Sequence, residues 1–167
     1  MQIRPENPGD GPIVRAIHEA AFETPAEAGL VELLREQASP IVSIVAEVEG
    51  TVVGHILFSP VTLEGHSELK VMGLAPMAVA PDFQNEGIGS ILVEEGLDEC
   101  RNLGTEAVVV LGHPNYYPRF GFVPSTRFAI DSEYEVPEEV FLVLELSAGA
   151  LEGKSGRAHY HPAFATL

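Results

Sequence analysis

The stretch with the clearest potential for chemistry is residues 77–90, which reads M-A-V-A-P-D-F-Q-N-E-G-I-G-S. Its first part has the pattern of a strand and stops at Pro81. A short polar loop with Gly87 and Gly89 follows, and then apolar residues recur at the three-to-four spacing of a helix. A glycine-bearing turn that starts a helix collects N–H groups without intrahelical partners, and the helix dipole adds partial positive charge. The stretch therefore predicts an anion site, whose usual occupant is phosphate.

The loop does not match the two commonest phosphate-binding motifs. The dinucleotide pattern G-x-G-x-x-G is absent, and no lysine follows the glycines as the G-x-x-x-x-G-K-[ST] pattern requires. What stands at 84–89 is Q-N-E-G-I-G, which resembles the Q/R-x-x-G-x-G/A loop of the GNAT N-acetyltransferase superfamily. In that family, backbone amides of the loop hold the pyrophosphate of coenzyme A. The alternative is that the two glycines only permit close helix packing.

The resemblance implies a binding site for acetyl-CoA along this stretch. Met77 and Val79 occupy alternate positions on one strand face, so their backbone groups would hydrogen-bond the pantetheine arm and polarise the thioester carbonyl. The residues expected to bind acetyl-CoA are Met77, Val79, Gln84, Asn85, Glu86, Gly87, Ile88, Gly89 and Ser90. Glu86 departs from the family pattern, in which a neutral or basic residue is commoner, because a carboxylate repels a bound phosphate.

A second motif, G-H-P-N-Y-Y-P-R-F-G-F, covers residues 112–122. It resembles the short helix ending in Tyr-x-x-x-Gly-Phe that is found in the same family. This match implies that Tyr117 is the general acid that protonates the leaving thiolate. Adjacent tyrosines are often packing groups, and we expect that role for Tyr116. The longer string L-G-H-P-N-Y-Y-P-R-F-G-F is similar to the YhbS-type branch of bacterial acetyltransferases, and the resemblance covers almost the whole chain.

The elements that position these motifs follow from periodicity, prolines and glycines. Pro76 interrupts the strand before the loop, which predicts a bulge or the end of pairing there, because proline cannot donate to a ladder. In the family, this is where two central strands splay around the pantetheine arm. The expected strands are at 2–4, 41–47, 51–59, 69–80, 106–111 and 140–146. One helix should begin at about residues 10–12, a second, capped by Thr24, should run to about Gln37, and a third should span 86–103.

Composition limits the classes of function. The chain of 167 residues has a formal net charge of −16, so nucleic acid would be repelled, whereas a cationic amine would not. No apolar run approaches the ~18 residues of a membrane span, and the first residues lack a signal-peptide core. The single cysteine, Cys100, fits a reducing cytoplasm. His159 and His161 alternate without a third spaced ligand, so we expect no metal site.

The resemblance implies an α/β (α+β) fold: a mixed, twisted sheet of about seven strands, with helices on both faces and a splayed central strand pair. We expect one domain over residues 1–167, in which 148–167 is a C-terminal extension packed on it. The expected reaction is acetyl transfer from acetyl-CoA to a primary amine of a small molecule or peptide. Two alternatives stay open at this point: an acyl-CoA-binding regulatory module without turnover, and a nucleotide-binding protein that uses the loop for ATP. Whether the protein forms a homodimer is also left open.

Overall fold

The computed structural model describes residues 1–167, which form three α-helices and nine strands together with short 3-10 turns. The helices and the long strands lie within a few residues of their predicted bounds. The helices are α1 (Gly11–Phe22), α2 (Ala26–Gln37) and α3 (Ile88–Asn102). The strands are β1 (Gln2–Pro5), β2 (Val42–Val48), β3 (Thr51–Leu63), β4 (Val71–Val79), β5 (Ala107–Leu111), β6 (Val123–Pro124), β7 (Ile130–Ser132), β8 (Phe141–Glu145) and β9 (Gly156–His159).

The nine strands form one mixed sheet, which confirms the predicted fold class although about seven strands were expected. The strand order is β1-β2-β3-β4-β5-β8-β6, and β9 pairs with both β3 and β7. The β4–β5 and β7–β9 pairs are parallel, whereas the pairs β1–β2, β2–β3, β5–β8, β6–β8 and β3–β9 are antiparallel. The strands that were not predicted, β6, β7 and β9, are two to four residues long, too short to show a period of two.

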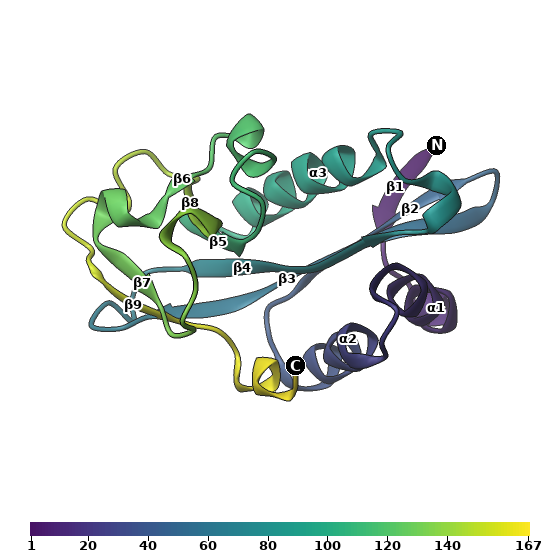
Figure 1. Ribbon diagram of the computed structural model, residues 1–167, viewed down its shortest axis with the longest axis horizontal. Coiled ribbons are helices and arrows are strands. Elements are labelled where there is room, and N and C mark those ends of the chain that lie inside the picture. Colours follow the sequence, from purple (N-terminus) through teal and green to yellow (C-terminus); the bar gives the residue numbers. More distant parts are fainter. The chain divides into compact units, whose positions relative to one another are not determined.

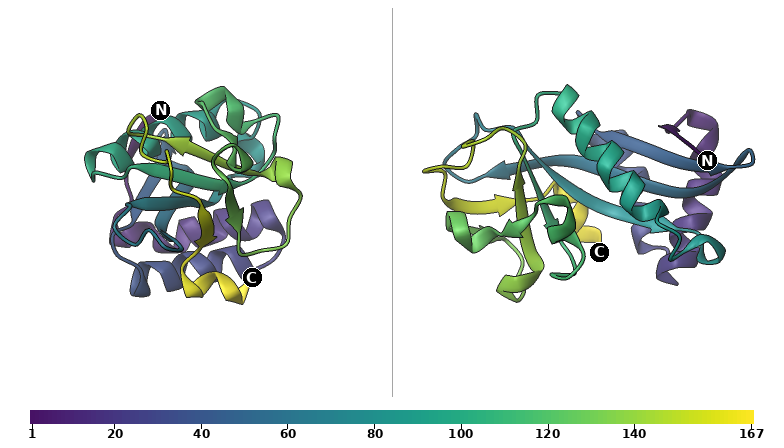
Figure 2. Two further views of the ribbon diagram at one scale, coloured as in Figure 1. Left: turned by 90° about the vertical axis from the view of Figure 1, so that its left-hand side faces the viewer. Right: turned by 90° about the horizontal axis from the view of Figure 1, so that it is seen from above.

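The chain divides into two compact units. Unit 1 comprises residues 1–59, 75–99 and 162–167, and unit 2 comprises residues 60–74 and 100–161. In unit 1, α1 and α2 cover one face of the sheet and α3 lies across β3 and β4 on the other face (Figures 1 and 2). Apolar residues at helical spacing explain this packing, because Val14, Leu34 and Leu92 are all fully buried.

Unit 2 is built around β5, whose residues Ala107–Val110 are all buried, as predicted for a central strand. β8 pairs with the whole of β5, from Ala107 opposite Glu145 to Leu111 opposite Phe141. β4 pairs with β5 only over Val71–Gly73. Pairing therefore ends three residues before Pro76, close to the predicted position.

Local details show how the elements begin, turn and end. Glu49 and Gly50, with φ of 50° and 80°, make the hairpin turn between β2 and β3 that the sequence indicates. At the start of α2 the helix cap falls on Pro25, and the Thr24 hydroxyl donates to the Glu27 carboxylate (3.0 Å) and accepts from the Ala26 N–H (3.4 Å). Leu103 is 47% exposed, because α3 ends one residue earlier.

Candidate functional site

The predicted anion-binding loop connects β4 to α3 within unit 1. After a 3-10 turn at Pro81–Phe83, Asn85 and Gly87 adopt left-handed backbone conformations, with φ of 64° and 86°. Left-handed residues in a turn can direct neighbouring N–H groups toward one concave side. The first α-helical hydrogen bond runs from the Ile91 N–H to the Gly87 carbonyl (3.2 Å). The amides of Ile88 and Gly89 therefore lie in the first turn of α3, where the helix dipole is positive.

The loop is accessible and anchored at its start. Gln84, Asn85, Glu86 and Gly87 are exposed, whereas Ile88 is buried and holds the helix on the sheet. Gln84 Nε2 donates to the Val79 carbonyl oxygen (3.0 Å), which ties the loop to the end of β4.

The loop's surroundings leave room for a ligand. A Cβ atom added at Gly87 would meet nothing within 4 Å, so the open side of the turn is not filled by protein. Gly89 and Ser90 are half-buried in the first turn of α3.

Met77 and Val79 share one face of β4 in unit 1, as the strand alternation predicts. Both are half-buried, whereas Ala78 between them is only 5% exposed. One lone pair of the Val79 carbonyl is already taken by Gln84. The residues of 77–90 that were predicted to bind acetyl-CoA are thus brought together in one continuous strand, loop and helix.

Tyr117 begins a 3-10 turn, Tyr117–Phe120, which Gly121 ends with φ of 98° in unit 2. The Tyr117 ring packs edge-on against Tyr116 and Phe122, with centroids 5.0 and 5.7 Å away. Gly112 forms the floor of this packing, because a Cβ atom there would stand 2.2 Å from Cε2 of the Tyr117 ring. A glycine is therefore required at position 112 for the tyrosine to keep its place.

The environment of Tyr117 keeps its hydroxyl protonated. Burial raises the pKa of Tyr117 to about 12, and the neighbouring Tyr116 adds to this effect. A phenol with this pKa carries its proton throughout the neutral range, so Tyr117 can donate a proton but does not act as a base. Nearby, the Arg119 guanidinium stacks over the Tyr116 ring at 4.4 Å and donates to the Tyr116 carbonyl, and His113 is exposed.

A buried chain of polar groups, which the sequence analysis missed, runs between α1 and β2 in unit 1. Glu6 accepts from the Ser43 hydroxyl (2.6 Å), so Ser43 must accept from His55 Nε2 (2.8 Å). His55 Nδ1 then accepts from His18 Nε2 (2.8 Å), which leaves His18 Nδ1 buried without a partner. Arg35 closes the chain on Glu6. The carboxylate thus fixes the direction of every hydrogen bond, and the tautomers of both histidines follow from it.

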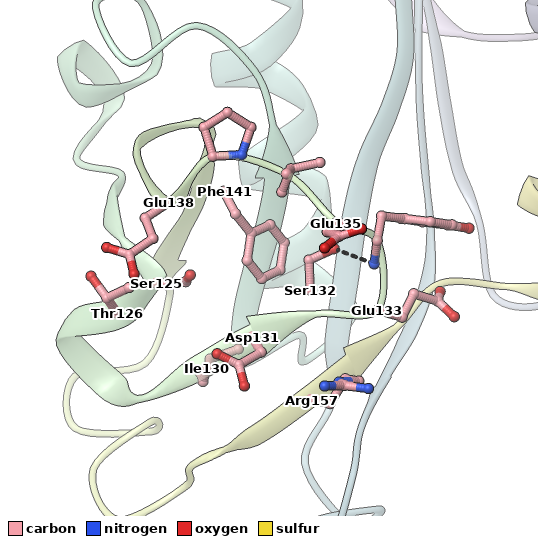
Figure 3. Close-up of a pocket in the computed structure, with 13 residues that line it drawn as sticks. Ser125, Thr126, Ile130, Asp131, Ser132, Glu133, Glu135, Glu138, Phe141 and Arg157 are labelled. Carbon is pink, nitrogen blue, oxygen red and sulfur yellow. Dashed lines mark hydrogen bonds between the residues drawn. The ribbon is translucent and has the colours of Figure 1, made fainter.

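A cavity of about 480 Å³ in unit 2 was also missed (Figure 3). Its wall comes from the segment after β6, from β7 and the loop that follows it, and from β8 and β9. Four carboxylates and one guanidinium line it: Asp131, Glu133, Glu135, Glu138 and Arg157. The run D-S-E-Y-E-V-P-E-E at 131–139 was the available sequence signal.

The structure shows neither a metal-binding cluster nor a membrane-spanning helix. No group of three or more histidine, cysteine or acidic side chains is arranged to hold a metal ion. None of the helices combines the length and apolar character that a membrane span requires.

Comparison with known proteins decides the family. The sequence profile of the acetyltransferase (GNAT) family matches residues 12–122, which include both motifs. The chain belongs to the GNAT acetyltransferase family. It is 39% identical over 165 residues, 98% of each chain, to the uncharacterized N-acetyltransferase YhbS of Escherichia coli K12.

Two solved GNAT structures are similar over nearly the whole chain. The crystal structure of Escherichia coli YhbS in complex with CoA superposes with a TM-score of 0.91 at 38% identity, covering 98% of this chain and 91% of that one. A GNAT acetyltransferase from Brucella melitensis in complex with acetyl-CoA gives a TM-score of 0.81 at 37% identity, covering 98% and 97%. The predicted family and enzyme class are thereby confirmed, and a catalytic role is supported over a purely regulatory one.

Proposed function

We propose that this GNAT protein transfers an acetyl group from acetyl-CoA to a primary amine. The observation that carries the proposal is the loop of residues 84–90, in which two left-handed residues precede the first turn of α3. This backbone suits the pyrophosphate of CoA without any lysine, since N–H groups and the helix dipole supply the positive potential. The CoA and acetyl-CoA complexes of two relatives that cover 98% of the chain support the choice of donor.

In such a transfer, the amine nitrogen attacks the thioester carbonyl, the carbon–sulfur bond breaks, and the sulfur takes up a proton. The residues proposed to bind the donor are Met77, Val79, Gln84, Asn85, Glu86, Gly87, Ile88, Gly89 and Ser90. The backbone amides of the loop would donate hydrogen bonds to the phosphates of CoA. Backbone groups of Met77 and Val79 would orient the pantetheine arm and the thioester, which places much of the catalysis in positioning.

Tyr117 is proposed to donate the proton that the leaving sulfur takes up. Its hydroxyl is protonated at neutral pH, and packing against Gly112 and Phe122 fixes its ring. A pKa near 12 makes it a weak acid, so its contribution belongs at the lower end of the usual ~10²–10⁴-fold for general acid catalysis. In this scheme the substrate amine would arrive neutral or lose its proton to water.

The substitution Gly89→Asp tests the donor site. A side chain at the first turn of α3 occupies the space where a phosphate approaches the backbone, and a carboxylate repels it. Calorimetry should show acetyl-CoA binding by the wild-type protein and none by the variant, while circular dichroism shows the same fold for both. Gly29→Ala, a helical glycine in α2, is the control and should bind normally.

Two results would refute the assignment of the loop. One is a folded Gly89→Asp variant that binds acetyl-CoA with unchanged affinity. The other is displacement of acetyl-CoA by ATP at equal concentration, which would indicate a nucleotide site instead.

A further inference from the structure

Tyr160 follows β9 and packs, within unit 2, at the place where β4 and β5 stop pairing. The last paired residues of the two strands are Gly73 and Val109. A Cβ atom at Gly73 would stand 2.7 Å from Cε2 of the Tyr160 ring and 2.9 Å from Cγ2 of Val61. The ring and the valine therefore fill the space that a side chain at position 73 would need. Tyr160 is only 6% exposed.

The Tyr160 ring is fixed by further neighbours in unit 2. The Tyr160 N–H donates to Glu133 Oε1 (2.7 Å), and the centroid of the Tyr134 ring lies 6.0 Å from that of Tyr160. Burial raises the pKa of Tyr160, and the nearby Tyr134, Glu133 and Tyr117 raise it further. The Tyr117 phenol therefore belongs to the surroundings of Tyr160.

An apolar hollow of about 10 Å³ lies beside the Tyr160 ring in unit 2. Its walls are aliphatic side chains of β3, β4, β5, β7, β8 and β9, together with Leu151. Two of the lining residues also flank the ring, because Val61 packs with it on Gly73 and Val109 stands opposite Gly73. A hollow of this size with aliphatic walls stays dry.

Strand alternation places the ring and the hollow on the same face of β4 and β5. Val71 and Gly73 are two residues apart in β4, and their partners in β5 are Ala107 and Val109. Residues two apart along a strand point to the same face. Val71, Ala107 and Val109 all line the hollow. Because Gly73 follows Val71 along β4, the Tyr160 ring stands beyond the hollow, toward the carboxyl ends of both strands.

The neighbourhood of Tyr117 relates this ring to the donor. If Tyr117 protonates the leaving sulfur, the thioester must come within reach of the Tyr117 hydroxyl. The acyl chain is bonded to the carbonyl carbon that carries that sulfur, so the chain also approaches Tyr160. We propose that Tyr160 determines the length of the acyl group, because its ring keeps chains longer than acetyl out of the apolar interior behind it. This inference rests on the proposed function.

Calorimetry with acetyl-CoA, butyryl-CoA and CoA tests the proposal and needs no acceptor. The wild-type protein should bind acetyl-CoA more tightly than butyryl-CoA, because the ring blocks the longer chain. Tyr160→Leu should bind butyryl-CoA about tenfold more tightly than the wild type does, as expected for the burial of two further methylene groups. Its affinity for acetyl-CoA and for CoA should stay within a few-fold. Tyr160→Phe keeps the ring and should keep the wild-type preference.

Val143→Ala is the matched control, because Val143 is fully buried and lines the hollow. This substitution enlarges the hollow but leaves the Tyr160 ring in place, so the preference for acetyl-CoA should not change. The double variant Tyr160→Leu/Val143→Ala should bind butyryl-CoA more tightly than Tyr160→Leu does. Tyr160→Met serves if circular dichroism shows that Tyr160→Leu is unfolded, and the same shift is expected because its unbranched chain is flexible.

Three results would overturn the proposal. The first is a folded Tyr160→Leu or Tyr160→Met variant that keeps the wild-type preference. The second is tight binding of butyryl-CoA by Val143→Ala alone, because the ring would then be no barrier. The third is equal affinity of the wild-type protein for acetyl-CoA and butyryl-CoA, which requires no variant to fold.

The same titrations separate this proposal from the proposed function. If the wild-type protein bound neither acetyl-CoA nor CoA, the proposed function itself would be wrong. If it bound acetyl-CoA while the folded Tyr160 variants kept its preference, only the role of Tyr160 would be wrong.

Discussion

Two residue clusters hold titratable side chains in fixed positions: one surrounds Tyr117, and the other contains His18 and His55. Tyr117 is held by rings and by the absence of a side chain at Gly112. His18 and His55 are held by a one-way hydrogen-bond chain that ends on Glu6. The first cluster stores a proton that can be donated, whereas the second keeps two imidazoles neutral in the core.

Tyr117→Phe removes one hydroxyl and almost no volume, so stability should change little. If Tyr117 is the general acid, kcat with any accepted amine should fall by about 10²-fold. Acetyl-CoA affinity should stay within a few-fold, because the loop that holds the phosphates is intact. Steady-state kinetics and calorimetry measure the two effects separately.

Tyr116→Phe is the matched control, because its ring stacks on the same cluster and keeps its packing as phenylalanine. It should retain nearly full activity. Wild-type turnover in Tyr117→Phe, or loss of turnover in Tyr116→Phe instead, would contradict the assignment.

The buried histidines should make stability fall as the pH is lowered. Burial lowers the pKa of His18 to about 4, with Arg35 as the second cause, and lowers the pKa of His55 well below its ordinary value of 6.5. Between pH 6.5 and 4 these histidines become protonated in the unfolded chain but stay neutral in the native state. The contribution of the neutral histidines to the free energy of unfolding is therefore fully present above pH 6.5 and is lost as the pH falls from 6.5 to 4.

For His18 alone the loss by pH 4 amounts to at most about 3 kcal/mol, and urea unfolding at several pH values measures it. Hydrogen bonding to Arg4 lowers the pKa of Asp10 from 3.8, so protonation of Asp10 reduces the stability only below this pH range. Exposed His159 has the opposite sign, because hydrogen bonding to Glu64 raises its pKa. Histidine NMR signals of His18 that titrate near pH 6.5 would refute the prediction.

At the scale of elements, α3 depends on two glycines that let it approach β3. A Cβ atom at Gly96 would stand 2.2 Å from Cε1 of Phe58, and one at Gly54 would stand 3.1 Å from Leu92. Close approach of the helix fixes where its first turn, and hence the loop of residues 84–90, is presented. The spacing of glycine and apolar residues on α3 is therefore a packing requirement that supports the anion site.

Gly96→Ala should destabilise the protein although alanine is the better helix former. Overpacking against the fully buried Phe58 costs about 1–3 kcal/mol, and improved helix propensity recovers at most about 1 kcal/mol. In α2, Gly29→Ala is the matched control, because nothing lies within 4 Å of the added Cβ atom. That substitution should stabilise by about 0.5–1 kcal/mol. Thermal and urea unfolding of both variants measure the difference, and a gain in both would show that the Phe58 contact relaxes freely.

Elements of clear period could be predicted from the sequence, and so could the loop between β4 and α3. The strands β6, β7 and β9 could not, because two to four residues carry no periodic signal. Tyr117 was found through a local motif. The His18–His55 contact joins residues 37 positions apart, so it depends on how α1 packs on β3, which no local pattern reveals.

The cavity of unit 2 was missed for the same reason. Its wall combines residues near 125, 131–138, 141 and 157, which strand pairing brings together. The acidic run at 131–139 was visible in the sequence, but a charge run alone is usually a solvated surface. Only the pairing of β7 with β9, and of β6 with β8, turns it into the side of a cavity.

At the scale of the whole molecule, charge is the dominant property. The chain has 25 acidic and nine basic residues. Several of the basic residues are already paired, as Arg4 is with Asp10 and Glu47 and Arg15 is with Glu32. The remaining carboxylates repel one another, so the folded state carries an electrostatic cost that depends on ionic strength.

Salt should therefore stabilise the protein. Raising NaCl from about 10 mM to about 150 mM shortens the screening length from about 30 Å to about 8 Å. Screening weakens attractive and repulsive pairs alike, but repulsive pairs outnumber attractive ones when 25 acids face nine bases. We expect Tm to rise by about 2–4 °C, equivalent to about 1 kcal/mol for a chain of this size.

Choline chloride at equal ionic strength should act as NaCl does, because the effect does not depend on a bound ion. A variant with Glu94, Glu95 and Glu152 changed to glutamine should start at a higher Tm and gain less from salt. A fall in Tm with salt would mean that the ion pairs of Arg4, Arg15 and Arg35 outweigh the net charge.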